Sequence, residues 1–154
     1  MSKSINLFFG ISFFVISFFA CKKAENQLPV PTNEEALITA KDWKMIAGTI
    51  NSQGGEINFY RNLPDCQKDD LVRYNLDNTT TYKSGPTKCH PDDPDISPGG
   101  TWVLDKEKKL FITYDSGDTT TMEILDLSTS TFTVSETNTT GGSSVTTIIT
   151  YSSN

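Results

Sequence analysis

Histidine is almost missing from this chain: His90 is the only one among 154 residues. The sequence also has neither a Gly-x-Ser-x-Gly elbow nor a His-Glu-x-x-His motif, the patterns that hold a nucleophile or a catalytic metal. Asp and Glu are plentiful, but no pair of them stands out as a general acid and base. We therefore predict a protein that is not an enzyme and that uses no cofactor.

Basic residues are too few and too scattered to form a positive surface. The chain has 13 Lys and Arg against 19 Asp and Glu, a formal net charge of −6. Nucleic-acid binding needs clustered Lys and Arg that neutralise phosphates, and no such stripe is present. The composition therefore excludes nucleic acid as the expected partner.

A sustained helical period is also lacking. After a short helical pattern in TNEEALITAKDW (32–43), apolar residues alternate in short runs between turn signals. The expected strands cover residues 43–50, 56–60, 71–76, 79–85, 100–105, 109–115, 119–127, 131–137 and 144–152. No helix is long enough for a parallel crossover. The pattern predicts an all-β fold: one antiparallel up-and-down barrel of about eight strands with a short N-terminal helix. An immunoglobulin-like sandwich acting as an adhesion module is the alternative.

The longest apolar run lies near the N-terminus. Residues 7–19, LFFGISFFVISFF, carry no charge and follow Lys3. A membrane-spanning helix needs roughly 20 apolar residues, so this run is too short to span. Its length and its positive flank are typical of a signal peptide.

The end of this run, Ala20 followed by Cys21, resembles the lipobox of bacterial lipoproteins. The resemblance implies cleavage before Cys21 and a thiol that carries acyl chains, palmitate among them. Two or more chains on one residue anchor a protein stably. We expect a signal peptide (1–20), a flexible tether (21–34) and one domain (35–154), held in the cell envelope at the outer membrane. Ordinary secretion with a free Cys21 is the alternative.

The other two cysteines, Cys66 and Cys89, form an even pair in a chain expected to leave the cytoplasm. An oxidising compartment favours a disulfide between them. The bridge would pin the segments 61–70 and 85–99 together at one end of the barrel. A zinc site with His90 is the alternative, but adjacent Cys89 and His90 would point to opposite faces of an extended segment.

Several motifs, in this order, resemble lipocalin-like lipoproteins of Gram-negative bacteria. They are LITAKDWKM (37–45), CQKDDLVRYNLDNTTTY (66–82), KCHPDDP (88–94) and GGTWVLD (99–105), and the resemblance extends over about residues 35–151. It implies a barrel that acts as a passive binding module. The family has no single ligand, so none is implied here.

Five aromatic residues are candidates for a pocket inside such a barrel. If they face inward, they could hold a small apolar or sugar-like ligand; they are Trp43, Tyr74, Tyr82, Trp102 and Phe132. Alternatively, the same rings fill the barrel. The protein would then be a structural or protein-interaction lipoprotein that uses its acidic loops, 61–70 and 86–99, to contact a partner.

A cluster of carboxylates in HPDDPDISPGG (90–100) raises the question of calcium. Asp92, Asp93 and Asp95 lie within four residues, but their spacing doesn't match an EF-hand loop. A solvated loop rich in Pro and Asp is the preferred interpretation, so no metal site is predicted. Asp69 and Asp70 would join this cluster if the disulfide draws the two loops together.

Overall fold

A computed structural model describes residues 33–114, 116–140 and 142–154. The expected signal peptide, Cys21 and all but the last two residues of the expected tether lie outside the described residues. Within the described part, no helix is long and apolar enough to cross a membrane.

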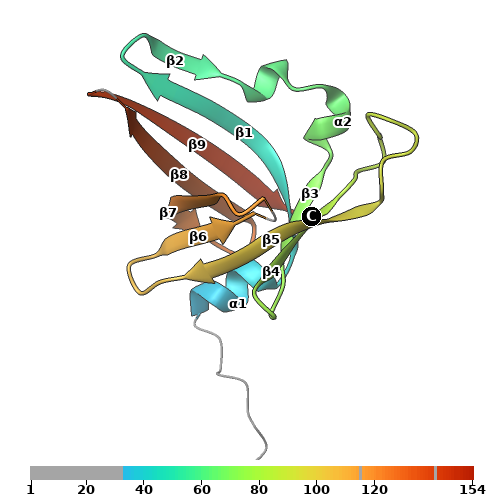
Figure 1. Ribbon diagram of the computed structural model, residues 1–154. Helices are drawn as coiled ribbons and strands as arrows, with labels where there is room; N and C mark the ends of the chain where they lie inside the picture. Colours follow the sequence, from blue (N-terminus) through green and yellow to red (C-terminus); the bar gives the residue numbers. More distant parts are fainter. Residues whose placement is uncertain (1–32, 115, 141) are drawn as a thin grey trace, which may run out of the picture. The chain divides into compact units, whose positions relative to one another are not determined.

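Strands dominate the described chain, as the alternating sequence pattern predicts (Figure 1). A helix, α1 (Asn33–Thr39), comes first, and a one-turn 3-10 helix (Tyr60–Asn62) and α2 (Asp65–Lys68) follow the second strand. The strands are β1 (Asp42–Ser52), β2 (Gly55–Asn58), β3 (Leu71–Tyr74), β4 (Thr79–Lys83), β5 (Ile96–Leu104), β6 (Lys109–Thr113), β7 (Thr119–Leu127), β8 (Thr131–Thr140) and β9 (Ser143–Ser153).

All the strand pairs are antiparallel, and the sheet closes on itself. From β3 to β9 each strand pairs with the next, and β1 pairs with β9 on one edge and with β3 on the other. β2 pairs only with the far end of β1, so the barrel proper has eight strands. The predicted up-and-down barrel is confirmed. The sandwich alternative is wrong, because the pairing of β1 with β9 leaves no two separate sheets.

Alternation along the strands sends one row of side chains into the barrel. The buried hydrophobic core comes from α1 and six of the strands: Ile38, Trp43, Val72, Tyr74, Trp102, Leu110, Ile112, Met122, Ile124, Phe132 and Val134. In β6, β7 and β8 the core residues alternate with residues outside the core: 110 and 112, 122 and 124, 132 and 134. The two-residue period that was read from the sequence therefore gives the correct inward face.

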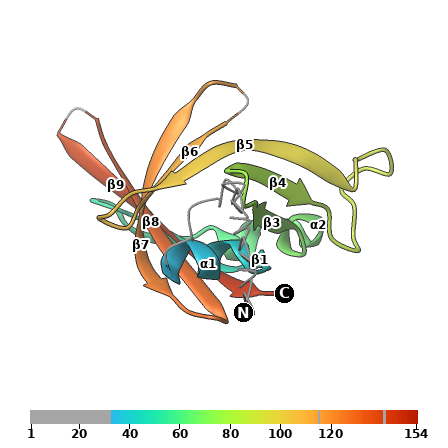
Figure 2. The same cartoon turned by 90° about the horizontal axis from the view of Figure 1, so that it is seen from below.

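The helix α1 lies across one end of the barrel (Figure 2). Its Ile38 side chain is completely buried in the core. The indole Nε1 of Trp43, on β1, donates a hydrogen bond of 2.8 Å to the Ile38 carbonyl oxygen. This bond satisfies a polar group that a buried tryptophan must pair, and it fixes the helix against the first strand.

The β3–β4 connection is wider than the two-residue Asp77-Asn78 turn that the sequence suggests. Strand β3 ends at Tyr74, and the Asn78 amide donates to the Asn75 carbonyl at 3.1 Å. Asn78 has the expected positive φ of 65°. Leu76 was expected at the end of the strand 71–76, on the same side as Val72 and Tyr74; this is wrong, because it falls in the turn and is three-quarters exposed.

Strand β5 also begins earlier than expected, at Ile96 rather than Gly100. It passes β6 very closely. A Cβ at Gly100 would lie 2.0 Å from the Thr113 carbonyl oxygen, and its φ is 103°. Only glycine fits here, because it has no Cβ and tolerates positive φ. The sequence motif GG therefore marks a close approach inside a strand, not a turn before one.

Cys66 and Cys89 form a disulfide, as predicted, with Cα atoms 5.2 Å apart. It joins α2 to the long β4–β5 connection. Asp69 and Asp70 strengthen the same junction, accepting hydrogen bonds from the backbone N–H groups of Thr87 (2.8 Å) and Gly85 (3.1 Å). With both sulfurs in the bridge, the zinc alternative is wrong.

Replacing both cysteines with serine (Cys66→Ser with Cys89→Ser) should lower the free energy of unfolding by about 3 kcal/mol, because the bridge closes a loop of 23 residues in the unfolded chain. Urea unfolding followed by tryptophan fluorescence measures this loss. A reducing agent should destabilise the wild-type protein equally and leave the double variant unchanged. Equal stability of both proteins would contradict the role assigned to the bridge.

Candidate functional site

The barrel isn't filled along its whole length. A cavity of about 390 Å³ lies inside it and opens to solvent. This volume falls in the usual range of small-molecule sites. Its walls come from β1, β3, β4, β6, β7, β9 and the segment before β3, and they consist of Trp43, Met45, Phe59, Leu63, Gln67, Asp70, Val72, Tyr74, Tyr82, Ile112, Tyr114, Met122, Ile149 and Tyr151.

The floor of the cavity is a cluster of aromatic rings around Phe132, which is completely buried. The ring centroids of Trp43, Tyr74 and Tyr151 lie 5.4, 5.9 and 5.7 Å from that of Phe132. Trp102 meets Tyr74 edge-on at 5.7 Å. Rings at these distances stabilise the fold by more than the burial of their apolar surface alone would give. The cluster therefore fills the half of the barrel next to α1 and leaves the other half hollow.

The rim of the cavity is built by the segment between β2 and β3. Leu63, Gln67 and Asp70 line the cavity from this segment. Phe59 lies directly on β1, because a Cβ at Gly48 would stand 2.3 Å from its Cζ atom. Glycine at position 48 thus lets an aromatic ring close part of the mouth. The predicted placement of residues 61–70 at one end of the barrel agrees with this arrangement.

Four of the five tyrosines line the cavity: Tyr74, Tyr82, Tyr114 and Tyr151. Burial raises the pKa of Tyr74 well above its ordinary value, and the neighbouring tyrosines 151, 82 and 114 raise it further. Burial likewise raises the pKa of Tyr151, Tyr82 and Tyr114. All four side chains line the same cavity, and the charge on one ionised tyrosine disfavours ionisation of its neighbours. They form a polar cluster within an otherwise apolar cavity.

The five aromatic residues singled out from the sequence divide into two groups. Trp43, Tyr74 and Tyr82 line the cavity. Trp102 and Phe132 lie beneath it, 3% and 0% exposed, in the packed half. Trp102 has a structural partner as well, because its Nε1 donates to the Asn75 carbonyl at 3.1 Å and holds the β3–β4 turn. A role for these residues in binding stays a prediction.

Sequence reasoning missed half of the tyrosine cluster. Tyr114 lies two residues after Ile112, so it continues the inward row of β6. Tyr151 pairs with Phe132 across β8 and β9. Both follow from strand parity once a single inward residue on each strand is known. Met45 follows from parity too, because it lies two residues after Trp43 and before the β-bulge between Met45 and Ala47. Phe59 could not be found in this way, since it lies outside the strands.

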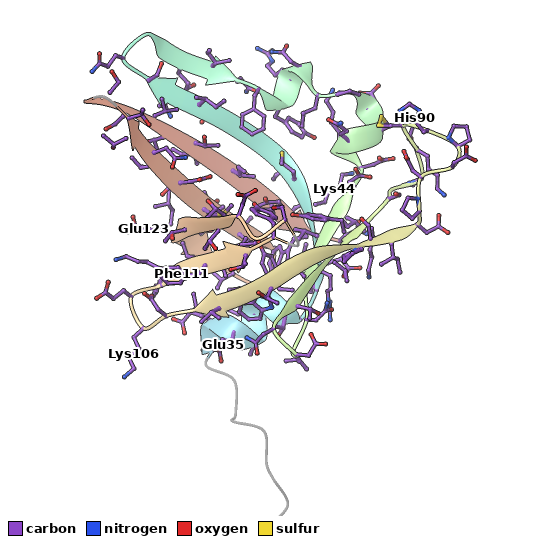
Figure 3. All side chains as sticks on the ribbon, viewed as in Figure 1. Glu35, Lys44, His90, Lys106, Phe111 and Glu123 are labelled. Carbon is purple, nitrogen blue, oxygen red and sulfur yellow. A yellow bond between two sulfur atoms is a disulfide. The ribbon has the colours of Figure 1, made fainter. Side chains whose placement is uncertain are left out.

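The aspartates of the 90–95 loop do not gather around a common point. Asp95 pairs with Lys88 at 2.7 Å, and Asp93 accepts a hydrogen bond from the His90 backbone amide at 2.8 Å. Among the described residues, no group of three His, Cys, Asp or Glu side chains is placed to hold a metal ion. Asp92, Asp93 and Asp95 therefore form no such group. Figure 3 shows His90 in this loop beside the disulfide. The loop has the hydrogen bonding of a surface turn.

Comparison with known families gives a match that covers most of the barrel. A family model described as "Lipocalin-like domain" matches residues 39–134, from the end of α1 to the middle of β8. The matched region includes the cavity walls up to Met122 and the Phe132 floor. No curated protein matches the chain.

Raised tyrosine pKa values predict a loss of stability at alkaline pH. Below about pH 10, tyrosine is neutral in both the folded and the unfolded chain. Above it, the unfolded chain ionises first, so the folded chain holds more protons and the free energy of unfolding falls with rising pH. Urea unfolding between pH 8 and 11 measures this slope.

The variants Tyr74→Phe and Tyr151→Phe should show a shallower slope, because each removes one buried hydroxyl and keeps the ring. Identical slopes in the wild type and both variants would contradict the assignment.

Proposed function

We propose that this chain, which belongs to the lipocalin-like domain family, is a binding module that holds a small apolar or sugar-like ligand in the open half of its barrel. Its action is passive: the cavity is formed before the ligand arrives, the ligand leaves water, and no covalent bond is made. The hollow beside the packed aromatic floor is the single observation that supports this proposal most strongly.

The shape and chemistry of the cavity support this use. Its walls are mainly apolar, with Gln67 and Asp70 at the rim and tyrosine hydroxyls inside. Binding sites of this kind combine an apolar surface with a few polar groups that orient the ligand. The ring cluster gives the cavity a rigid floor. The side chains there are already ordered, so they lose little conformational entropy when a ligand enters.

The alternative of a completely filled barrel accounts for only half of the interior. Trp102, Leu110 and Phe132 pack with α1 as a filled barrel requires. The other half has an open volume, which a purely structural protein would not need. The acidic loops 61–70 and 86–99 are joined by the disulfide, but no described feature of their surface points to a protein partner.

We also propose that Cys21 carries a lipid anchor and that residues 21–34 tether the domain to the outer membrane. The support is the sequence alone: a short apolar run that ends at Ala20-Cys21, followed by Lys22 and Lys23. Two or more acyl chains would hold the domain at the membrane, and the two lysines would attract anionic head groups.

A blocked cavity should abolish ligand binding. N-phenyl-1-naphthylamine, an uncharged apolar dye that fluoresces out of water, should bind the wild-type protein. Met45→Trp places a bulky ring in the cavity wall, so its affinity for the dye should fall by about ten-fold or more. Val103→Trp is the matched control, because Val103 is 57% exposed on β5. Dye binding that is absent in the wild type, or equal in both variants, would contradict the proposed cavity.

Anchoring can be measured on protein purified from its own host. Intact mass spectrometry should show a chain that begins at Cys21 and carries the mass of two or more acyl groups. The Cys21→Ser variant should leave the membrane fraction on cell fractionation. A wild-type chain that still begins at Met1, or an unmodified Cys21 thiol, would contradict the anchor without affecting the barrel.

A further inference from the structure

The polar groups in and below the cavity differ in whether they have a hydrogen-bond partner within the protein. The two indole N–H groups are used: Trp43 donates to Ile38 at 2.8 Å, and Trp102 donates to Asn75 at 3.1 Å. The hydroxyls of Tyr74, Tyr82, Tyr114 and Tyr151 have no hydrogen-bond partner in the described chain. A buried tyrosine hydroxyl normally has one. Four unpaired phenols in one cavity therefore need an explanation.

These hydroxyls are not sealed inside the protein. The described side-chain atoms that are both fully buried and unpaired belong to Asp42, Asp69 and Thr80. Tyr74, Tyr114 and Tyr151 are not among them, so their hydroxyls are reached from the cavity, and the Tyr82 side chain is 41% exposed. Each phenol is a donor and an acceptor. Together they offer a ligand several hydrogen bonds at one place.

Positive charge is missing from this place. Within the described residues, the cavity wall contains no Lys, Arg or His, and its one ionisable group besides the tyrosines is Asp70. Glu136, on β8, is not part of the wall, but after burial its negative charge is the second cause that raises the pKa of Tyr114. Glu136 accepts hydrogen bonds from Thr120 (2.6 Å) and Asn138 (3.0 Å), neither of which neutralises it.

We propose that the cavity selects an uncharged amphiphile, with its apolar chain on the aromatic floor and its oxygen atoms on the four tyrosine hydroxyls, and that it discriminates against fatty-acid anions. This inference rests on the proposed binding function and specifies its ligand class. A carboxylate in the cavity would lose its water without gaining a cation, and the one carboxylate already on the wall, Asp70, would repel it. The raised pKa of the tyrosines reflects the same resistance to negative charge.

An ammonium head group fits less well than an oxygen atom. Asp70 and the phenolic oxygens could accept its N–H groups, but an ammonium group accepts no hydrogen bond itself. It would therefore leave the phenolic O–H groups without acceptors, and its charge costs more to remove from water than a neutral oxygen does. Alcohol, ester, ether and sugar oxygens accept those hydrogen bonds without carrying charge. The ligand class is therefore a neutral molecule with an apolar part and an oxygen-bearing end.

Three ligands with the same chain test this selection: decan-1-ol, decanoate and decylammonium, each used at pH 8 to displace N-phenyl-1-naphthylamine from the purified protein. Decan-1-ol should bind about ten-fold more tightly than decanoate, because only the anion is buried without a countercharge. The ammonium should bind more weakly than the alcohol. Decanoate or decylammonium binding as tightly as the alcohol would overturn the inference.

Variants test whether the tyrosine hydroxyls and the absence of positive charge cause this preference for the neutral ligand. Tyr82→Phe with Tyr114→Phe should weaken decan-1-ol binding by about five-fold or more, since two hydrogen bonds are lost while both rings remain. The control is Tyr60→Phe, because Tyr60 is the one tyrosine outside the cavity wall. Gln67→Lys puts a cation at the exposed rim and should raise decanoate affinity several-fold.

Two kinds of failure can be told apart. If the wild-type protein binds neither the dye nor any of the three ligands, the proposed binding function itself is wrong. If the dye binds and Met45→Trp blocks it, but the double phenylalanine variant behaves like Tyr60→Phe, the cavity is used and the tyrosine selection is wrong.

Discussion

The packing of three aromatic rings around Phe132 is the constraint on which the rest of this structure depends. Phe132 on β8 meets Trp43 on β1, Tyr74 on β3 and Tyr151 on β9, so one buried ring ties together the strands at which the barrel closes. Trp43 also hydrogen-bonds α1, which covers that end. Rigid rings fill this end of the barrel, and the cavity lies above them.

The cavity depends on backbone features as much as on side chains. Gly48 lets Phe59 lie on β1 at the mouth, and Gly100 lets β5 approach β6. On the other side, the Cys66–Cys89 disulfide holds the rim segment against the β4–β5 connection. The floor is thus fixed by packing, whereas the rim is fixed by a covalent bond and backbone contacts. The tyrosine hydroxyls lie between the floor and the rim, and within the described chain they make no hydrogen bond to either. We therefore expect these hydroxyls to select the ligand.

Alternation in the sequence was enough to predict the all-β class, the meander order and most inward residues, because a strand on a filled interior has a strict two-residue period. The disulfide was predicted separately, from an even pair of cysteines in a chain expected to leave the cytoplasm. Alternation could not separate the floor of the cavity from its wall. Trp43 and Trp102 both point into the barrel, and only the relative positions of their strands place Trp43 on the cavity wall and Trp102 below it. The start of β5 was missed because Pro98 and the glycine pair after it were read as a loop.

The central claim is that one half of the barrel is packed and the other half is an accessible cavity. Methionine methyl groups report on it directly, since Met45 and Met122 both line the cavity and the third methionine is Met1. Carbon-13 NMR of methyl-labelled methionine should show both signals shifting together, and saturating, as decan-1-ol is added. Signals that stay unchanged at saturating decan-1-ol would contradict an accessible cavity and leave only a filled barrel.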